Sequence, residues 1–248
     1  MIACSVLRII KRTAPSIFLF IIFGQIAACT FIQPTRVPIE SQYYNYDESN
    51  SILVVLLPGF GDLPEHFVTH GTVDQITACH AAVNILGVNS HFGYYRNSTI
   101  VERLREDIII PARASGIEQI WLFGISMGGL GSLLTLRENP DDIHSVIVMA
   151  PYIGNWDEMS DFISDPEKAA QSIRPELIDL WQWLAAKPKG EANITLAFGA
   201  DDRLNPQHRW LASLLAESQV VESPGGHKWA TWETLWPQAF KKSGLCDN

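Results

Sequence analysis

The sequence has little of what nucleic-acid-binding, metal-binding and nucleotide-binding proteins need. Its 248 residues include 18 Lys and Arg against 27 Asp and Glu, a formal net charge of −9. Because nucleic-acid phosphates require a basic protein face, this balance argues against a nucleic-acid partner. Histidines and cysteines do not cluster at metal-ligand spacing, and no phosphate-binding loop is present, so we expect neither a metal nor a cofactor.

The sequence also lacks an apolar run that is comfortably long enough to cross a bilayer. The apolar residues 16–24 follow three basic residues and no acidic one. A basic start, a short apolar centre and small residues after it are typical of a secretory signal. Residues 26–29, Ile-Ala-Ala-Cys, resemble the bacterial lipobox, in which the cysteine is lipidated and becomes the new N-terminus. An ordinary signal peptide or an uncleaved anchor helix is the alternative.

This resemblance implies that residues 1–28 are a lipoprotein signal peptide and that residues 29–50 are the lipidated Cys29 followed by a polar tether. Loss of residues 1–28 would leave 15 basic and 27 acidic residues, a net charge of −12. The expected location is the bacterial cell envelope, with the lipid anchor in the membrane. The next residue is Thr30, and in lipoproteins a residue other than aspartate there favours the outer membrane, if the source has one.

Cysteines are few, and two of the four fall in or next to the signal. Cys4 would leave with the signal peptide, and Cys29 would carry the lipid. Cys79 and Cys246 are left in the mature chain. Outside the cytosol they could form a disulfide, or they could be two buried thiols, and the sequence leaves both open.

From residue 51 to residue 242, apolar runs typical of strands alternate with helical patterns. The sequence contains no internal repeat. Strands are expected at residues 52–57, 83–88, 120–123, 145–149, 194–198 and, in short form, from residue 220. Helices are expected at about 64–80, 99–114, 127–138, 207–217 and 229–242, with a tail at 243–248. Strands that are apolar throughout are buried on both faces. The pattern therefore predicts an α/β fold with a mostly parallel sheet covered by helices on both faces.

Residues 151–193 do not fit this alternation and are expected to form a small helical cap insertion. It would lie above the C-terminal edge of the sheet, where open parallel sheets bind ligands. Its many aromatic residues suggest a substrate with an apolar acyl or aryl group, or they only pack the insertion onto the domain. Trp181 and Trp183 are two residues apart in an expected helix and would point about 200° apart, so at most one should face a substrate.

One serine stands between glycines where an expected strand becomes a helix. Residues 124–128 read Gly-Ile-Ser-Met-Gly. A strand, Gly-x-Ser-x-Gly and a helix form the nucleophile elbow, a turn too tight for side chains at Gly124 and Gly128. The turn holds the hydroxyl of Ser126 clear of the backbone. The start of the helix directs free N–H groups toward the same place.

A serine hydroxyl needs a base and an acid that orients the base. Elbow enzymes order these groups along the chain as serine, acid and histidine. Of the seven histidines, only His227 lies on a glycine-rich loop after the last expected strand. The acid should follow the strand at 194–198, where Asp201 and Asp202 are both candidates.

The oxyanion of such a reaction needs two backbone N–H donors. One is expected from Met127, directly after the serine. The other is expected from Phe60, in the loop Pro-Gly-Phe-Gly-Asp at 58–62 that follows the first long strand. The glycines on both sides of Phe60 would let the backbone approach a substrate. A plain turn is the alternative for this loop.

Four segments together resemble the serine-triad branch of the α/β-hydrolase superfamily over residues 51–242. They are LLPGFGD, GISMGG, FGADDRLNP and GGHKW, in this order along the chain. In this family a glycine ends the strand, the acid follows three residues later, and a proline often stands four residues further on. Gly199, Asp202 and Pro206 match that spacing, which favours Asp202 over Asp201.

The resemblance implies a carboxylesterase- or lipase-like serine hydrolase that acts on small-molecule esters or thioesters. Ser126 would be the nucleophile, His227 the base and Asp202 the orienting acid, with Phe60 and Met127 as oxyanion donors. Members of this family often begin with two further strands, which residues 30–50 barely provide, so this antiparallel start is expected to be reduced or missing. A peptidase, amidase or perhydrolase, and a non-catalytic binding or assembly protein, are the alternatives, because fold does not choose the chemistry.

Overall fold

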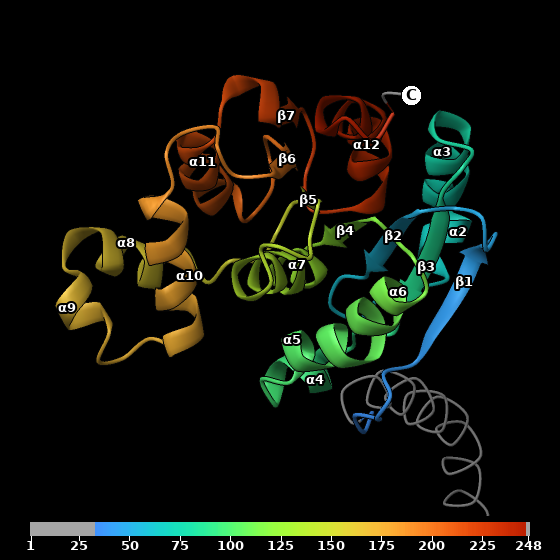
Figure 1. Ribbon diagram of the computed structural model, residues 1–248. Helices are drawn as coiled ribbons and strands as arrows, with labels where there is room; N and C mark the ends of the chain where they lie inside the picture. Colours follow the sequence, from blue (N-terminus) through green and yellow to red (C-terminus); the bar gives the residue numbers. More distant parts are fainter. Residues whose placement is uncertain (1–32, 247–248) are drawn as a thin grey trace, which may run out of the picture.

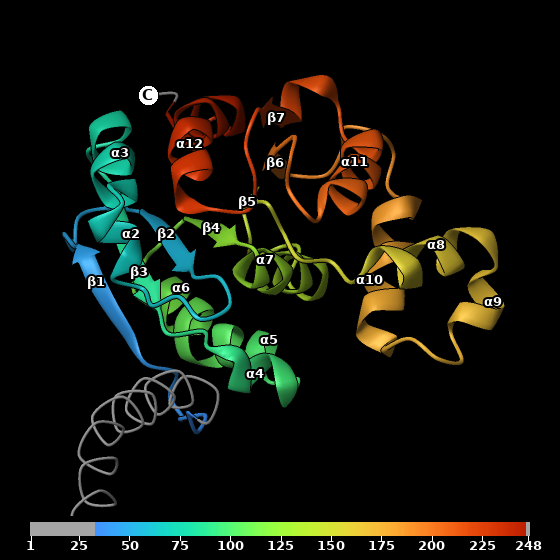
Figure 2. The ribbon, with the colours of Figure 1, turned by 180° about the vertical axis from the view of Figure 1, so that it is seen from behind.

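The computed structural model describes residues 33–246, which form a seven-stranded sheet between two layers of helices (Figure 1, Figure 2). The strand order is β1-β3-β2-β4-β5-β6-β7. All neighbouring pairs are parallel except β1 and β3, which pair antiparallel. The predicted signal peptide and Cys29 lie outside the described residues.

The parallel strands coincide with the apolar runs of the sequence. They are β2 (Ile52–Leu57), β3 (Asn84–Val88), β4 (Gln119–Ile125), β5 (Ser145–Met149), β6 (Ile194–Gly199) and β7 (Val220–Ser223). Nearly every residue of β2 to β6 is buried, because each of these strands has neighbours on both sides and helices on both faces. The predicted α/β fold with a mostly parallel, doubly covered sheet is confirmed.

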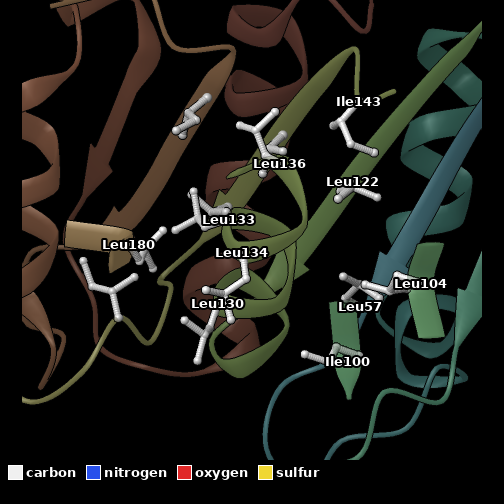
Figure 3. Close-up of a cluster of buried hydrophobic side chains, with 14 of the residues drawn as sticks. Leu57, Ile100, Leu104, Leu122, Leu130, Leu133, Leu134, Leu136, Ile143 and Leu180 are labelled. Carbon is white, nitrogen blue, oxygen red and sulfur yellow. The ribbon is translucent and has the colours of Figure 1, made fainter. Parts of the chain in front are cut away.

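The two helical layers bury two separate apolar clusters. On one face lie α5 (Ile100–Leu104), η1 (Arg105–Ile109), α6 (Ile110–Ala114) and α7 (Met127–Glu138). Leu57 and Leu122 of the sheet belong to the same buried cluster as Leu104 of α5 and Leu130 of α7, and Leu57 lies beside Leu104 (Figure 3). On the other face lie α3 (Thr72–Cys79) and α12 (Trp229–Ser243).

Some predicted helices are broken, and each break has a local cause. The helix expected at 64–80 is divided into α2 (His66–Thr69) and α3, because Gly71 adopts a φ of +77°. The helix expected at 99–114 contains the π-helical turn η1, which ends two residues before Pro111, because the proline ring lacks an N–H and needs extra room in the preceding turn. Outside the segment 151–193, the described residues also form α4 (Phe92–Arg96), α11 (Asn205–Leu214) and the 3₁₀ turn η2 (Glu217–Gln219).

The first described segment packs onto the domain instead of hanging from it as a tether. Residues Ser41–Asn45 form β1, an edge strand that pairs with β3. Ile39 is buried in the core, and its N–H donates to Asp107 Oδ2 at 2.7 Å. The polar composition of this stretch suits an edge strand with an exposed face. In the part of the chain that the structure describes, the antiparallel start of the sheet is thus the single strand β1.

The segment after α12 is covalently linked to the end of α3. Cys79 ends α3, and Cys246 follows α12 by three residues. The two form a disulfide with their Cα atoms 4.9 Å apart. Of the two possibilities that the sequence left open, the structure contains the disulfide, so residues 243–246 are not a free tail.

The segment 151–193 forms a lobe beside α7 and α11 in both views of the ribbon (Figure 1, Figure 2). It contains α8 (Trp156–Ser164), α9 (Pro166–Ala169) and α10 (Pro175–Ala186). Trp181 is fully buried, and its Nε1–H donates to the carbonyl oxygen of Ile153 at 2.8 Å. Trp183 is half-buried, with the ammonium of Lys187 over its ring. Among residues 33–246, no helix has the length and apolar character to cross a membrane.

Candidate active site

Ser126 occupies the turn between β4 and α7 with a strained backbone. Its φ is +52° and its ψ is −112°, values that a residue with a side chain rarely adopts. The surroundings hold it there, because the Ser126 N–H donates to Met149 O at 2.9 Å and its carbonyl accepts from Tyr152 N–H at 2.9 Å. The carbonyl also accepts from the first turn of α7.

The two glycines of the turn are required by close backbone contacts. A Cβ on Gly124 would lie 2.3 Å from the carbonyl oxygen of Gly128, and a Cβ on Gly128 would lie 1.9 Å from the carbonyl oxygen of Leu57. Real Cβ atoms do not approach other atoms so closely. The Gly-x-Ser-x-Gly spacing therefore brings α7 against the end of β2, where the expected oxyanion loop begins.

The three predicted triad residues meet, although they lie far apart in the sequence. Ser126 Oγ is 2.9 Å from His227 Nε2, and His227 Nδ1 is 2.8 Å from Asp202 Oδ2. Asp202 follows β6 and His227 follows β7, so both lie at the same edge of the sheet as Ser126. With Nδ1–H donating to the carboxylate, Nε2 is left to accept the serine hydroxyl proton.

The carboxylate of Asp202 is kept ionised by its hydrogen bonds. Its side chain is fully buried, and burial alone would raise its pKa. The hydrogen bond from His227, the Leu204 N–H that donates to Oδ1 at 2.8 Å and nearby positive charge outweigh burial, so the pKa lies below the usual value. An ionised acceptor at this position holds the imidazole of His227 in one orientation.

The other candidate acid, Asp201, bonds to the loop that carries His227. Its Oδ2 accepts a hydrogen bond from the Gly225 N–H at 3.0 Å, and the Asp201 N–H donates to Gly225 O at 2.9 Å. No local sequence pattern indicates this role, because Asp201 and Gly225 are 24 residues apart. Asp201 joins the acid loop to the loop that carries His227.

Two glycines let these loops approach each other. A Cβ on Gly199 would lie 2.1 Å from the carbonyl oxygen of Gly225. Gly225 has a φ of +124°, and a Cβ there would lie 2.4 Å from Thr231 Oγ1. Gly226 differs, since the nearest atom to its Cβ would be Asp201 O at 3.5 Å. Gly199 and Gly225 therefore set the distance between Asp202 and His227.

The expected oxyanion loop is linked to the histidine loop by Asp62. Its Oδ1 accepts from Trp229 Nε1–H at 3.3 Å and lies 2.9 Å from His66 Nδ1. Trp229 comes two residues after His227 and stacks on the ring of His70, with ring centroids 4.2 Å apart. The hydrogen bond between Asp62 and Trp229 therefore fixes the loop at 58–62 relative to His227.

Ser126 opens into a cavity of about 610 Å³, which is within the usual range for small-molecule sites. Phe60 and Met127, the expected oxyanion donors, line it together with Ser126. The other uncharged walls are Phe92, Tyr95, Leu130, Tyr152 and Leu204. Within residues 33–246, no group of three or more His, Cys, Asp or Glu side chains is arranged to hold a metal ion.

The insertion reaches this cavity through residues that the sequence did not single out. Neither Trp181 nor Trp183 lines it, which agrees with the expectation that at most one of them faces a substrate and favours the alternative that these aromatics pack the insertion. Trp181 instead packs over Gly154 and against Phe162 inside the lobe. Arg174, directly before α10, lines the cavity, and so does Arg203, beside Asp202. Exposed arginines carry no sequence signal that separates them from ordinary surface charges.

A second histidine is buried close to the acid. His208 in α11 is fully buried, and its Nε2–H donates to Pro151 O at 3.1 Å. Burial lowers its pKa to about 4, against the opposing effect of the Asp202 charge. Its Nδ1 has no hydrogen-bond partner among the described residues. His208 is therefore neutral at neutral pH, and His227 is the imidazole that hydrogen-bonds to Asp202.

Comparison with known proteins places this arrangement in context. The profile of the family described as "Putative esterase" matches residues 109–242, more than half of the chain. The fold is similar to that of S-formylglutathione hydrolase (FrmB) from Staphylococcus aureus, with a TM-score of 0.56, 13% identity, and coverage of 87% of this chain and 100% of that chain. Est1E from Butyrivibrio proteoclasticus gives a TM-score of 0.55 at 18% identity, covering 84% and 94%. No curated protein matches the sequence.

Proposed function

Because the chain belongs to the esterase family, we propose that it is a serine hydrolase that cleaves carboxylic esters or thioesters through an acyl-enzyme on Ser126. The observation that carries this proposal is the unbroken hydrogen-bond chain from Asp202 through His227 to Ser126. It ends at the wall of a largely apolar cavity of about 610 Å³. Both features suit an uncharged ester carbonyl with an apolar acyl or aryl group.

In the first half of the reaction, Ser126 Oγ attacks the carbonyl carbon while His227 Nε2 takes the hydroxyl proton. The N–H groups of Phe60 and Met127 stabilise the negative charge that develops on the carbonyl oxygen. The tetrahedral intermediate collapses, and the leaving alcohol or thiol receives the proton from His227. Asp202 remains ionised and stabilises the imidazolium that forms between these steps.

In the second half, a water molecule takes the place of the alcohol. His227 accepts a proton from the water as the water oxygen attacks the acyl carbon. The second tetrahedral intermediate then releases the carboxylic acid, and His227 returns its proton to Ser126 Oγ. No group outside the five named residues is needed for either half.

The proposal is tested with p-nitrophenyl esters of increasing acyl length and with peptide p-nitroanilides. We expect turnover of esters, with kcat/KM at least about 10³-fold lower in Ser126→Ala. Ser164→Ala, an exposed serine in α8 that contacts only backbone carbonyls, is the control and should behave as the parent. Faster cleavage of anilides than of esters would favour a peptidase, and no turnover of any substrate would favour a non-catalytic protein.

We also propose that the enzyme is a lipoprotein of the bacterial cell envelope, held in the membrane by a lipid on Cys29. The support is the sequence alone: the basic start, the short apolar run and Ile-Ala-Ala-Cys at 26–29. The first described residues lead directly into β1 at the edge of the sheet. An anchor at Cys29 would therefore hold the domain close to the membrane surface.

A further inference from the structure

Two arginines line the cavity next to the nucleophile, and they supply all of its charge. Arg203 comes from the loop between β6 and α11, and Arg174 comes from the insertion. Among the described residues that line this cavity, none carries a carboxylate. In a chain with 27 acidic and 18 basic residues, a cavity lining with two arginines and no acidic residue differs from the average composition of the chain.

Both guanidinium groups keep N–H donors that no contact within the described residues occupies. Arg203 has no hydrogen-bond or ion-pair partner for its side chain in the described part of the chain, although it lies between Asp202 and Leu204. Within residues 33–246 the side chain of Arg174 has one ion-pair partner, with Nη1 3.3 Å from Glu176 Oε1, and this side chain is 49% exposed. An exposed pair of this kind contributes little and leaves most of the five guanidinium N–H donors available.

The other residues that line the cavity indicate that the rest of a ligand would be apolar. The ring of Phe60 packs edge-on against Phe92, with centroids 5.3 Å apart, and Tyr152 and Leu130 add further apolar surface. A ligand in this space would place an apolar body against these side chains and an acidic group at the two arginines. Guanidinium groups bind carboxylates and phosphates through paired hydrogen bonds.

We propose that the enzyme prefers esters that carry an anionic group, a carboxylate or a phosphate, which Arg174 and Arg203 bind while Ser126 attacks the ester carbonyl. This inference depends on the proposed esterase function and adds the charge of its substrate. The anionic group belongs either to the acyl part of the ester or to its leaving alcohol. In both cases the arginines would bind its negative charge.

The test compares charged esters with neutral analogues of the same size. On the acyl side, p-nitrophenyl hydrogen adipate is compared with its carboxamide analogue. On the alcohol side, 4-carboxyphenyl acetate is compared with 4-carbamoylphenyl acetate, and all rates are corrected for spontaneous hydrolysis. We expect kcat/KM to favour the anionic ester by about tenfold or more in at least one pair, and to favour it less at high ionic strength.

Variants of the two arginines test whether these side chains cause the preference for anionic esters. Arg174→Gln and Arg203→Gln should each lower the anionic-to-neutral ratio about fivefold, with the neutral ester within about threefold of the parent. The double variant should show no preference. Arg105→Gln is the matched control, since Arg105 is an exposed arginine on η1 that pairs with Glu106 and does not line the cavity.

Three results would overturn the proposal. They are equal kcat/KM for both members of both ester pairs, a preference that survives in the double variant, and equal losses on anionic and neutral esters in the arginine variants. If the neutral esters are turned over in a Ser126-dependent manner while the ratio is unaffected, only the inference fails. If the parent hydrolyses no ester, the proposed function fails and the inference fails with it.

Discussion

Asp201 and Gly225 are joined by two hydrogen bonds, one through the Asp201 carboxylate at 3.0 Å and one between their backbones at 2.9 Å. The neighbouring Asp202 points elsewhere and reaches His227 Nδ1 at 2.8 Å. Adjacent carboxylates thus have separate tasks. Asp201 holds the histidine loop in place, and Asp202 orients the imidazole.

The first prediction separates the two aspartates by their amide variants. Asp202→Asn would present an N–H₂ group or a weaker acceptor to His227 and favour the wrong tautomer, so we expect kcat to fall at least about 10²-fold. Asp201→Asn keeps an oxygen that can accept from Gly225, and its kcat should stay within about tenfold of the parent. A crippled Asp201→Asn beside an active Asp202→Asn would show that the acid is misassigned.

The second prediction concerns the adjacent glycines before the base. Gly225→Ala places a Cβ 2.4 Å from Thr231 Oγ1 at a φ of +124°. We expect it to lower the free energy of unfolding by about 1–3 kcal/mol and to reduce kcat by moving His227. Gly226→Ala meets no atom closer than 3.5 Å and is the control, expected to be close to the parent. Similar behaviour of both variants in denaturant titrations and ester assays would argue against this loop geometry.

The third prediction is a pH dependence of stability that comes from His208. Burial lowers the pKa of His208 to about 4, below its ordinary value of 6.5. Between these values the unfolded chain binds a proton that the folded protein does not, so stability falls as pH drops from about 6.5 to about 4. The loss from this group is at most about 3 kcal/mol.

This dependence is measured by urea unfolding at several pH values between 7 and 4.5. His208→Gln keeps an N–H donor for Pro151 O but does not titrate, so its stability should vary less over this range, whatever its absolute value. The depressed pKa of Asp202 adds a loss only at lower pH, as that carboxylate becomes protonated. An unchanged slope in His208→Gln would contradict the assignment.

The fourth prediction concerns the membrane anchor. Serine cannot form the thioether to the lipid, so Cys29→Ser should leave the protein unprocessed or release it from the membrane fraction. Each buried lipid CH₂ contributes about 0.8 kcal/mol, and several chains are needed for stable anchoring. Fractionation and intact mass of parent and variant give the readout, and Thr30→Ser serves as control. Identical fractionation and mass for Cys29→Ser and the parent would reject the lipobox.

Local sequence patterns were sufficient for the central part of this fold. Strands that are buried on both faces have continuous apolar sequences, so the positions of β2 to β6 in the chain can be predicted from the sequence. The elbow could be located because Gly124 and Gly128 are dictated by backbone contacts within and next to the turn. Ser126, Asp202 and His227 were selected by motif and chain order, and the structure brings them within hydrogen-bond distance.

Other features depend on tertiary contacts that no local pattern records. β1 forms because β3 offers a free edge and Ile39 finds the core, although its own sequence is polar. The sequence leaves open whether the tryptophans of the insertion contact a substrate or pack the lobe, and Trp181 packs inside the lobe, where it donates a hydrogen bond to Ile153 O. Arg174 could not be placed at the cavity from the sequence, because its position depends on how the lobe lies against α7.

The fifth prediction addresses the nucleophile itself, by mapping the covalent adduct of a fluorophosphonate on the purified enzyme with mass spectrometry. Proton transfer to His227 makes Ser126 far more reactive than the other serines, so we expect one adduct per molecule, on the peptide that contains Ser126. Labelling should be absent in Ser126→Ala and much slower in His227→Ala. An adduct on a different residue, or none from a preparation that hydrolyses esters, would contradict the assignment of Ser126 as the nucleophile.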